Sequence, residues 1–383
     1  NYTGLSDVTG NEPPTYSAVG TSDAIASWRT VESRIHAIQA NGTDAEIEVF
    51  DGLTHGFGLG TGTIAEGWIY HAVSFWENQS EPKQEKFMKN GRNIPQNLEI
   101  IPDAYRKPAE QEGTLVRLAY DTWESFSYKQ QSQKLTKTAW VYLPYGYDET
   151  QKYNIFYLSH GGWSNEETVL GTDKNPSELK YAIDHAIQDG RMKPLILVCP
   201  TYNNTSAKDS WDYGLALQLT DQFHHELMGD LVPAVERKFH TWADYDISLE
   251  NLRSSRNHRG FGGFSMGSVN TWHTFQYCLD YFRYFMPMSG NMGDGRWIDT
   301  VVRSSEWKDD DFFIWAATGS ADFAESGFSY QINSMVNDYR GTFHLADNEL
   351  DGNVSYRLYE GGTHGPEQSN QYTFNALLWF WNE

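Results

Sequence analysis

From residue 114 onward, short apolar runs alternate with longer stretches of helical periodicity, and this alternation limits the fold more than any other feature of the chain. The predicted strands, of which the first alternates in polarity, cover residues 138–143, 154–159, 195–199, 312–317 and 354–359. Pro144 and Pro200 end two of these runs, as turn residues commonly end strands. Strands that alternate with helices predict a mostly parallel sheet with helices on both faces, which is an α/β fold.

One of the predicted helices is long. Apolar side chains recur at steady four-residue steps from Leu219 to Phe239, which describes one face of an amphipathic helix. Pro233 falls within this stretch and has no N–H to donate, so we expect it to kink the helix.

A serine lies in the sequence Gly-Phe-Ser-Met-Gly at residues 263–267, between a strand-like stretch over 258–264 and a helical stretch over 269–280. This order is typical of the tight strand-to-helix turn that exposes a nucleophilic serine. The glycines permit the sharp turn, and the start of the following helix favours negative charge at the same place. Because a glycine-rich turn with a solvated serine would look the same, Ser265 needs further support as a nucleophile.

A carboxylate and a base follow Ser265 in chain order. Asp322 comes after the apolar run over 312–317, and His364 comes after the run over 354–359. A serine hydroxyl is a weak nucleophile and needs a base that a carboxylate orients. In α/β-hydrolases these groups occur in the order Ser, Asp, His, in loops past strand ends. The sequence therefore predicts a catalytic triad of Ser265, Asp322 and His364.

The sequence His-Gly-Gly-Trp at residues 160–163 closes an early strand, where α/β-hydrolases form part of the oxyanion hole. We expect the backbone N–H of Met266 to supply one donor and that of Gly162 or Trp163 the other. His160 precedes the nucleophile in the chain, so we expect it to brace this loop rather than to react.

Residues 114–383 resemble a carbohydrate esterase of family one, of the feruloyl esterase type. The likeness is carried by the sequences at 158–166, 262–267, 319–323 and 362–364. The resemblance implies an α/β-hydrolase fold, hydrolysis of ferulate esterified to arabinose side chains of xylan, and neither cofactor nor metal. It implies acylated plant polysaccharide or its oligosaccharides as the partner, and a secreted or periplasmic location.

Aromatic residues are abundant, at 15% of the chain. A feruloyl group presents a flat π-face on which a Trp or Tyr ring can stack. The candidates for such contacts, all in loops after predicted strand ends, are Trp163, Tyr202, Trp211 and Trp297. Ordinary packing is the alternative for each of the four.

Two segments of the chain, residues 20–77 and 319–381, resemble each other. Both contain a Gly-x-x-Asp turn, then a Thr-His-Gly sequence, and then an aromatic segment predicted to be helical. Residues 1–77 thereby resemble the carboxyl-terminal part of a second, acetylxylan-esterase-like α/β-hydrolase, with Asp23 and His55 at the triad positions. No serine turn precedes this pair in the sequence, so we expect it to be catalytically idle in this chain. The alternatives are that the segment docks on the main domain and shapes its cleft, or completes a site in another chain.

We accordingly expect three parts: a small α/β segment over 1–77, a linker over 78–113 and a catalytic domain over 114–383. The 78–113 stretch is polar and poor in aliphatic residues, which is typical of linkers, although an ordered arm on the body is the alternative. The sequence opens at Asn1 without Met, so we expect a mature or excised piece whose export signal lies outside it.

Charge and cysteine content exclude several classes of function. The net charge of −22 makes nucleic acids and anionic membrane surfaces poor partners. No apolar run approaches the roughly 18 residues that would suggest a membrane span. Cys199 and Cys278 both lie in apolar segments, so we expect buried thiols rather than a disulfide, and no cysteine cluster for a metal.

The sequence as a whole predicts a serine esterase acting on acylated plant polysaccharide, with three alternatives. An acetylxylan esterase would use the same chemistry on a smaller acyl group. A non-catalytic carbohydrate-binding protein could retain the fold, since fold alone does not give function. An acyltransferase would pass the acyl group to a sugar hydroxyl instead of water. The sugar linkage and the oligomeric state stay open.

Overall fold

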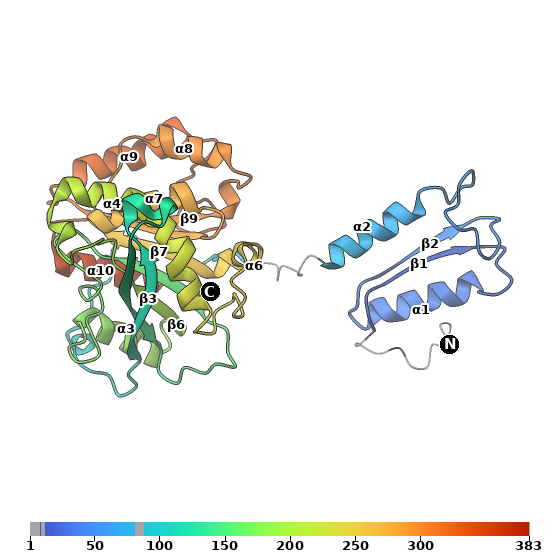
Figure 1. Cartoon of the computed structure of the whole chain (residues 1–383), viewed down its shortest axis with the longest axis horizontal. Coiled ribbons are helices and arrows are strands. Elements are labelled where there is room, and N and C mark those ends of the chain that lie inside the picture. Colours follow the sequence, from blue (N-terminus) through green and yellow to red (C-terminus); the bar gives the residue numbers. More distant parts are fainter. Residues whose placement is uncertain (1–7, 9–11, 81–87, 383) are drawn as a thin grey trace. The chain divides into compact units, whose positions relative to one another are not determined.

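The structure is a computed structural model that describes residue 8, residues 12–80 and residues 88–382. The chain divides between residues 86 and 87 into a smaller and a larger unit (Figure 1). No helix in these described ranges is both long and apolar enough to cross a membrane.

The described part of the smaller unit contains two strands and two helices. Its elements are β1 (Thr15–Gly20), α1 (Trp28–Ala40), β2 (Ala45–Phe50) and α2 (Trp68–Ser80). The two strands pair in parallel, from Thr15 opposite Ala45 to Gly20 opposite Phe50. A small cluster of buried apolar residues, Ile35, Ile38 and Ala45, holds α1 against the strands.

The larger unit is built on an eight-stranded sheet with the order β10-β9-β8-β7-β5-β6-β4-β3. Its strands are β3 (Thr114–Trp123), β4 (Lys134–Leu143), β5 (Asn154–Ser159), β6 (Leu195–Cys199), β7 (Arg259–Phe264), β8 (Tyr284–Met288), β9 (Phe313–Gly319) and β10 (Val354–Tyr359). Strand β4 runs antiparallel to β3 and β6, and the remaining neighbours are parallel. The mostly parallel sheet predicted from the sequence is confirmed.

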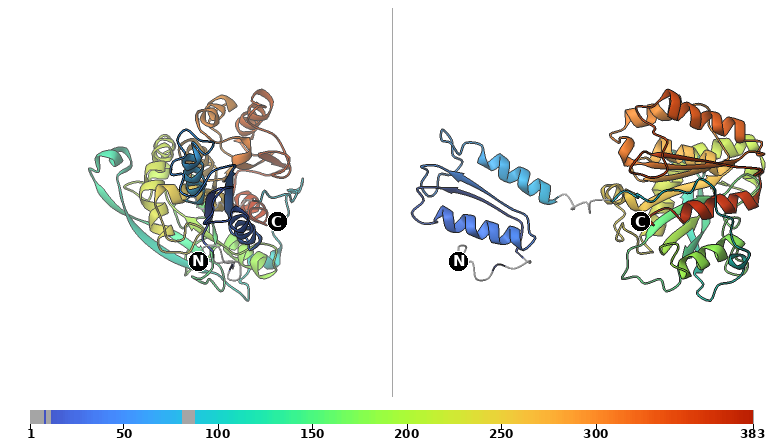
Figure 2. Two further views of the ribbon diagram at one scale, coloured as in Figure 1. Left: turned by 90° about the vertical axis from the view of Figure 1, so that its right-hand side faces the viewer. Right: turned by 180° about the vertical axis from the view of Figure 1, so that it is seen from behind.

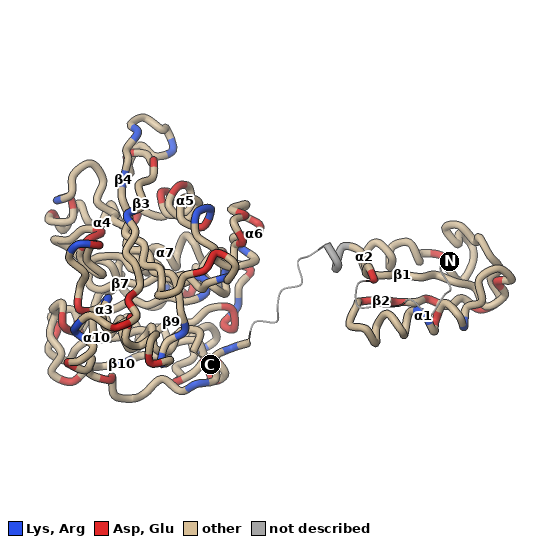
Figure 3. The backbone as a smooth tube through the Cα atoms, turned by 90° about the horizontal axis from the view of Figure 1, so that it is seen from below, with Lys and Arg blue, Asp and Glu red and all other residues tan. Residues whose placement is uncertain are grey.

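Helices cover both faces of this sheet (Figures 1 and 2). They are α3 (Glu178–Gln188), α4 (Tyr213–Glu226), α5 (Val232–Glu236), α6 (Leu249–Ser254), α7 (Met266–Cys278), α8 (Gly295–Ser304), α9 (Glu325–Asp338) and α10 (Pro366–Leu377). Successive residues of β5 belong to two separate cores on opposite faces of the sheet. Tyr157 belongs to the core that includes residues of α4, α7 and α9, whereas Phe156 belongs to the core that includes residues of α3 and α10. Acidic and basic positions are interspersed along the backbone (Figure 3).

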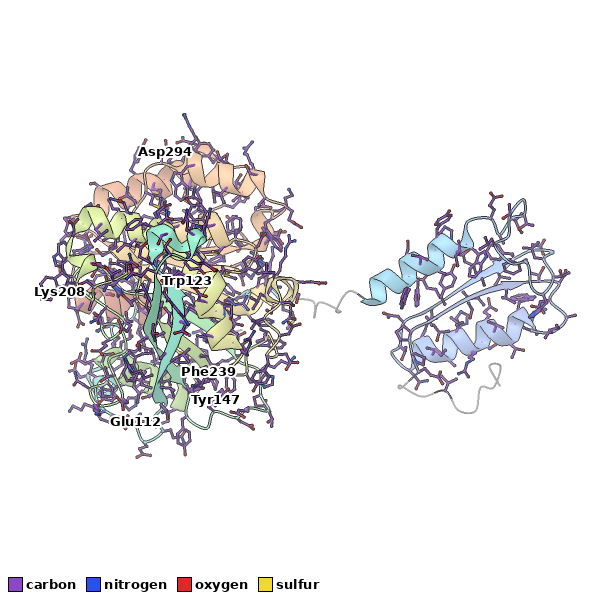
Figure 4. All side chains as sticks on the ribbon, viewed as in Figure 1. Glu112, Trp123, Tyr147, Lys208, Phe239 and Asp294 are labelled. Atoms are coloured by element: carbon purple, nitrogen blue, oxygen red, sulfur yellow. The ribbon has the colours of Figure 1, made fainter. Side chains whose placement is uncertain are left out.

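The predicted long helix is interrupted. It comprises α4, a π-helical turn over Leu227–Leu231, and α5, which has Pro233 in its first turn. Proline is tolerated there because the N–H it lacks would have no partner within α5. Beyond α5, Phe239 packs edge-on against Tyr147, with 6.4 Å between ring centroids (Figure 4).

Residues 88–113 form an arm that packs on the larger unit. The backbone N–H of Asn90 donates to Glu349 over 2.7 Å, and Arg357 donates to the carbonyl of Ile94 over 2.7 Å. Ile94 and Ile101 are each only 3% exposed. Apolar burial and backbone hydrogen bonds thus fix this segment to the sheet domain.

The linker predicted over 78–113 is therefore corrected. Residues 78–80 belong to α2, and residues 88–113 are the ordered arm that was the alternative. Residues 81–87 lie outside the described residues.

The carboxyl-terminal aromatic segment departs from the predicted helix over 376–381. Helix α10 ends at Leu377, and the next residues form turns. Trp379, Phe380 and Trp381 are all buried, and a helix cannot bury three successive side chains on one face. Both cysteines are buried free thiols, as predicted.

Candidate active site

Ser265 occupies the tight turn between β7 and α7, with φ 60° and ψ −119°. Such a conformation costs a non-glycine residue about 1–3 kcal/mol and persists only where the surroundings enforce it. Its backbone N–H donates to Met288 over 2.8 Å, and its carbonyl accepts from Ser268 over 2.9 Å. The side chain, partly exposed, is thereby held at the carboxyl end of the central strand.

The two glycines of the motif are required by close contact. A Cβ atom added to Gly263 would lie 2.5 Å from the carbonyl oxygen of Ser159, and one added to Gly267 would lie 2.4 Å from it. The serine turn therefore presses against the end of β5, where no side chain larger than hydrogen fits.

Asp322 and His364 form a hydrogen-bonded pair. The imidazole Nδ1 lies 2.8 and 2.9 Å from the two carboxylate oxygens. The Asp322 side chain is fully buried and that of His364 is 16% exposed. Because Nδ1 donates to the carboxylate, Nε2 is left as an acceptor.

One cavity of about 310 Å³ joins the predicted site residues. Ser265 and His364 both line it, together with Gly162, Trp163 and Met266. The structure thus brings the serine, the histidine and the two loops of the predicted oxyanion hole to one opening, with Asp322 bonded behind the histidine.

The hydrogen bonds of the turn distinguish between Gly162 and Trp163, the two candidate oxyanion donors that the sequence left open. The N–H of Trp163 already donates to the carbonyl of Ser210 over 2.9 Å. Gly162 is thereby favoured as the donor from this turn. The turn lies close to the nucleophile, because a Cβ on Gly161 would be 3.5 Å from the Cβ of Ser265.

His160 braces this loop, as its position in the chain suggested. Its Nδ1 donates to the carbonyl of Gly161 over 2.7 Å, and Nε2 accepts from the hydroxyl of Thr201 over 2.8 Å. Burial lowers the pKa of His160 to about 4, which keeps the ring neutral at physiological pH.

Among the aromatic candidates, Trp163 lines the cavity and is 65% exposed. Of the other three, burial contradicts the prediction for Tyr202, and those for Trp211 and Trp297 stay predictions. Tyr202 is 1% exposed and donates to the carbonyl of Gly161, so its ring is buried and has no face open to a substrate. Trp211 lies under the ammonium of Lys208, and Trp297 packs edge-on against a neighbouring ring; neither is among the described residues around this cavity.

The cavity also has lining residues that the sequence reasoning missed, notably Tyr213, Asn291 and Phe323. Phe323 is 81% exposed, and its ring centroid lies 4.2 Å from that of His364. Its position directly after Asp322 was an available signal. Tyr213, at the start of α4, and Asn291, in the loop after β8, carried no comparable signal, because neither lies in a motif.

The smaller unit contains a second pair of the same kind. His55 Nδ1 lies 2.8 Å from Asp23 Oδ2, and the N–H groups of Ile25 and Ala26 donate to Oδ1. The N–H of Ala26, more than any other group, lowers the pKa of Asp23 and keeps it ionised. In the described part of the chain, no group of three or more His, Cys, Asp or Glu side chains could hold a metal ion.

Comparisons with known proteins find relatives for most of the larger unit. Residues 132–325 match the family model described as "Putative esterase". The chain is 35% identical over 293 residues to "Endo-1,4-beta-xylanase Y" of Acetivibrio thermocellus, covering 74% of this chain and 24% of that protein. It is 29% identical over 174 residues to "Endo-1,4-beta-xylanase/feruloyl esterase" of Xylanibacter ruminicola, covering 44% and 20%. The chain thus spans about a quarter or less of these curated relatives.

Among solved structures, a mutant of the feruloyl esterase module from Clostridium thermocellum, complexed with sinapinate, is similar to this chain. The two are 33% identical with a TM-score of 0.64, and the match covers 78% of this chain and 97% of that one.

Proposed function

This chain belongs to the esterase family, and from that premise we propose that its larger unit hydrolyses feruloyl and related hydroxycinnamoyl esters on arabinoxylan. The observation that carries the proposal is the cavity that Ser265 and His364 share beside exposed aromatic rings. The feruloyl esterase relatives support the same acyl group, and the complexed ligand of one of them, sinapinate, is a hydroxycinnamate.

The proposed mechanism is acyl transfer through Ser265. The serine Oγ attacks the ester carbonyl while His364 Nε2 takes its proton and then gives it to the leaving sugar hydroxyl. Asp322 fixes the imidazole tautomer and stabilises the imidazolium. The N–H groups of Met266 and Gly162 hold the oxyanion, and water, activated by the same histidine, hydrolyses the acyl-enzyme.

The cavity favours a flat acyl group over acetyl. Trp163, Tyr213 and Phe323 contribute three aromatic side chains to its lining. Rings of this kind interact with a feruloyl π-system by stacked or edge-on contact. An acetyl group has no ring and cannot make such contacts.

Release of ferulate and of acetate from one arabinoxylan preparation that carries both esters tests this proposal. We expect ferulate to be released with the higher kcat/KM. Faster release of acetate would make the chain an acetylxylan esterase, and release of neither acid would overturn the proposed function.

Replacing Phe323 by alanine is expected to lower kcat/KM for methyl ferulate by about 3- to 10-fold, the effect of losing one aromatic contact. Hydrolysis of p-nitrophenyl acetate should change much less, since the acetyl group does not use the ring. Trp211→Ala is the matched control, because Trp211 is exposed but lies off the cavity. Equal losses on both substrates would contradict a role of Phe323 in acyl recognition.

A polymeric substrate also limits the cellular location of the enzyme. Plant polysaccharide is accessible only outside the cytoplasm, so we propose a secreted or periplasmic enzyme that acts on acylated polysaccharide or its oligosaccharides. The xylanase activity named for the relatives supports this location.

A further inference from the structure

The smaller unit repeats one quarter of the larger unit's architecture. Its order β1-α1-β2-α2 matches β9-α9-β10-α10, and in both copies the two strands are parallel neighbours. Strand β10 is the edge strand of the larger sheet, so β2 corresponds to an edge strand and β1 to an inner one.

The turns after the inner strands agree in their hydrogen bonds. The N–H of Thr21 donates to Phe50 over 2.9 Å, and that of Ser320 donates to Tyr359 over 2.9 Å. The hydroxyl of Thr21 accepts from a glycine N–H over 2.7 Å, and the hydroxyl of Ser320 does so over 2.8 Å. These turns are built the same way.

The contact between the two loops also agrees. A Cβ on Gly20 would lie 2.0 Å from the carbonyl oxygen of Leu53, and one on Gly319 would lie 2.1 Å from that of Gly362. This approach sets the distance between the carboxylate loop and the histidine loop. As a result, His55 meets Asp23 through Nδ1 at 2.8 Å, the distance between His364 and Asp322.

The copies differ in what lies on the other side of the inner strand. Strand β9 pairs with β8 as well as β10, and all of its residues are buried. Within the described residues, β1 pairs with β2 alone, and its first four residues are only partly buried. The free edge of β1 is therefore the position that β8 occupies in the larger unit, with β7 and the serine turn next to it.

Helix α2 likewise has apolar side chains that no described part of the smaller unit covers. Tyr70 is 74% exposed and Val73 is 42% exposed, whereas Leu378, the counterpart of Val73, is 7% exposed. In the larger unit the corresponding segment is buried against the strands that the smaller unit lacks. A surface of exposed large apolar side chains beside an unpaired strand edge is that of one part of a domain without the rest of it.

The exposure of the second histidine is consistent with this. The side chain of His55 is 53% exposed, compared with 16% for His364. One of the rings over His364 is Phe264, which directly precedes Ser265, at 4.6 Å between centroids. The uncovered side of His55 is thus the side where a nucleophile turn would lie.

We propose that residues 12–80 are the carboxyl-terminal part of a second esterase domain. Asp23 and His55 become catalytic when a segment that contains a strand-serine-helix turn and the strand after it pairs, through that second strand, with the free edge of β1. The segment is assigned to the same natural polypeptide, outside residues 1–383. A part of a domain whose main core is three buried residues has little stability of its own, and covalent linkage supplies the missing segment at an effective concentration of about millimolar.

The completed site would act on carboxylic esters. The serine oxygen of the added segment attacks the acyl carbon, and His55 Nε2 takes the serine proton. The alcohol then leaves with that proton. Water then attacks the acyl-serine and gives its own proton to His55, so that the acid is released and the serine restored. This site is independent of the one proposed for Ser265.

The test uses the full-length product of the natural gene, with Ser265→Ala to silence the first site. We expect this protein to keep one serine that reacts with a fluorophosphonate probe, and to hydrolyse p-nitrophenyl acetate. Adding His55→Ala or His55→Gln should lower that hydrolysis by at least about 100-fold, as expected for loss of a general base. His71→Ala is the matched control, since His71 is an exposed histidine in the same unit whose Nδ1 contacts Glu48.

The chain of residues 1–383 gives the complementary result. Here Ser265→Ala should abolish probe labelling, and replacing Asp23 and His55 together by alanine, with Ser265 intact, should leave ester turnover unchanged. Three outcomes would overturn the proposal: no reactive serine in the full-length Ser265→Ala protein, residual activity that His55 variants leave intact, or a tenfold loss in the chain of residues 1–383 when Asp23 and His55 are replaced. Because the decisive arms lack Ser265, failure of the feruloyl assignment would not affect them.

Discussion

Replacing Ser265 by alanine is expected to reduce kcat for methyl ferulate by at least about 10⁴-fold, because the covalent route through the acyl-enzyme is lost. The fold should persist. The turn is held by backbone hydrogen bonds and by the contacts of Gly263 and Gly267 with Ser159, none of which involves the hydroxyl.

The measurement is turnover of methyl ferulate, with thermal melting as the check on folding. Ser304→Ala is the matched control, since Ser304 is exposed at the end of α8 and does not line the cavity. A Ser265→Ala protein that keeps most of its activity would mean that another residue is the nucleophile.

Replacing Arg259 by methionine is expected to destabilise the larger unit by about 3–5 kcal/mol, the cost of leaving a buried charge without its partner. Arg259 begins β7, the strand that ends at Ser265, and its guanidinium donates to Glu236 over 2.6 and 2.8 Å. The two side chains are 1% and 0% exposed. At this size of domain the loss corresponds to a drop in Tm of about 5–8 °C.

Two further variants make this prediction specific. Arg259→Met combined with Glu236→Gln should recover much of the loss, because no unpaired charge then remains. Arg253→Met removes a more exposed ion pair with Glu306 and should cost under about 1 kcal/mol. Equal Tm shifts for the Arg253 and Arg259 variants would contradict the argument.

The main sheet was largely predictable because its strands are buried on both faces. The run over Asn154–Ser159 is apolar at its four inner positions and ends in turn residues, so its bounds match the structure. The arm over residues 88–113 was harder to predict. It is fixed by a few buried side chains and by hydrogen bonds to distant residues, and its polar composition resembles that of a linker.

The residues of the site also differ in how well the sequence predicted them. Ser265, Asp322 and His364 were predicted because each lies just past the carboxyl end of a strand in one mostly parallel sheet, so their proximity follows from topology. The acyl-binding side chains lie on loops whose paths depend on long-range contacts. Tyr202 and Trp297 therefore appeared equivalent to Trp163 in sequence, although only Trp163 faces the cavity.

The arm has a practical consequence for anyone trimming this protein for crystallisation or screening. A version starting at residue 114, where the catalytic domain begins by sequence, would remove the donor that Asn90 supplies to Glu349 and uncover the sites filled by Ile94 and Ile101. Such a truncated esterase would be prone to aggregate, and its low yield would be mistaken for poor catalysis. The cut belongs near residue 87.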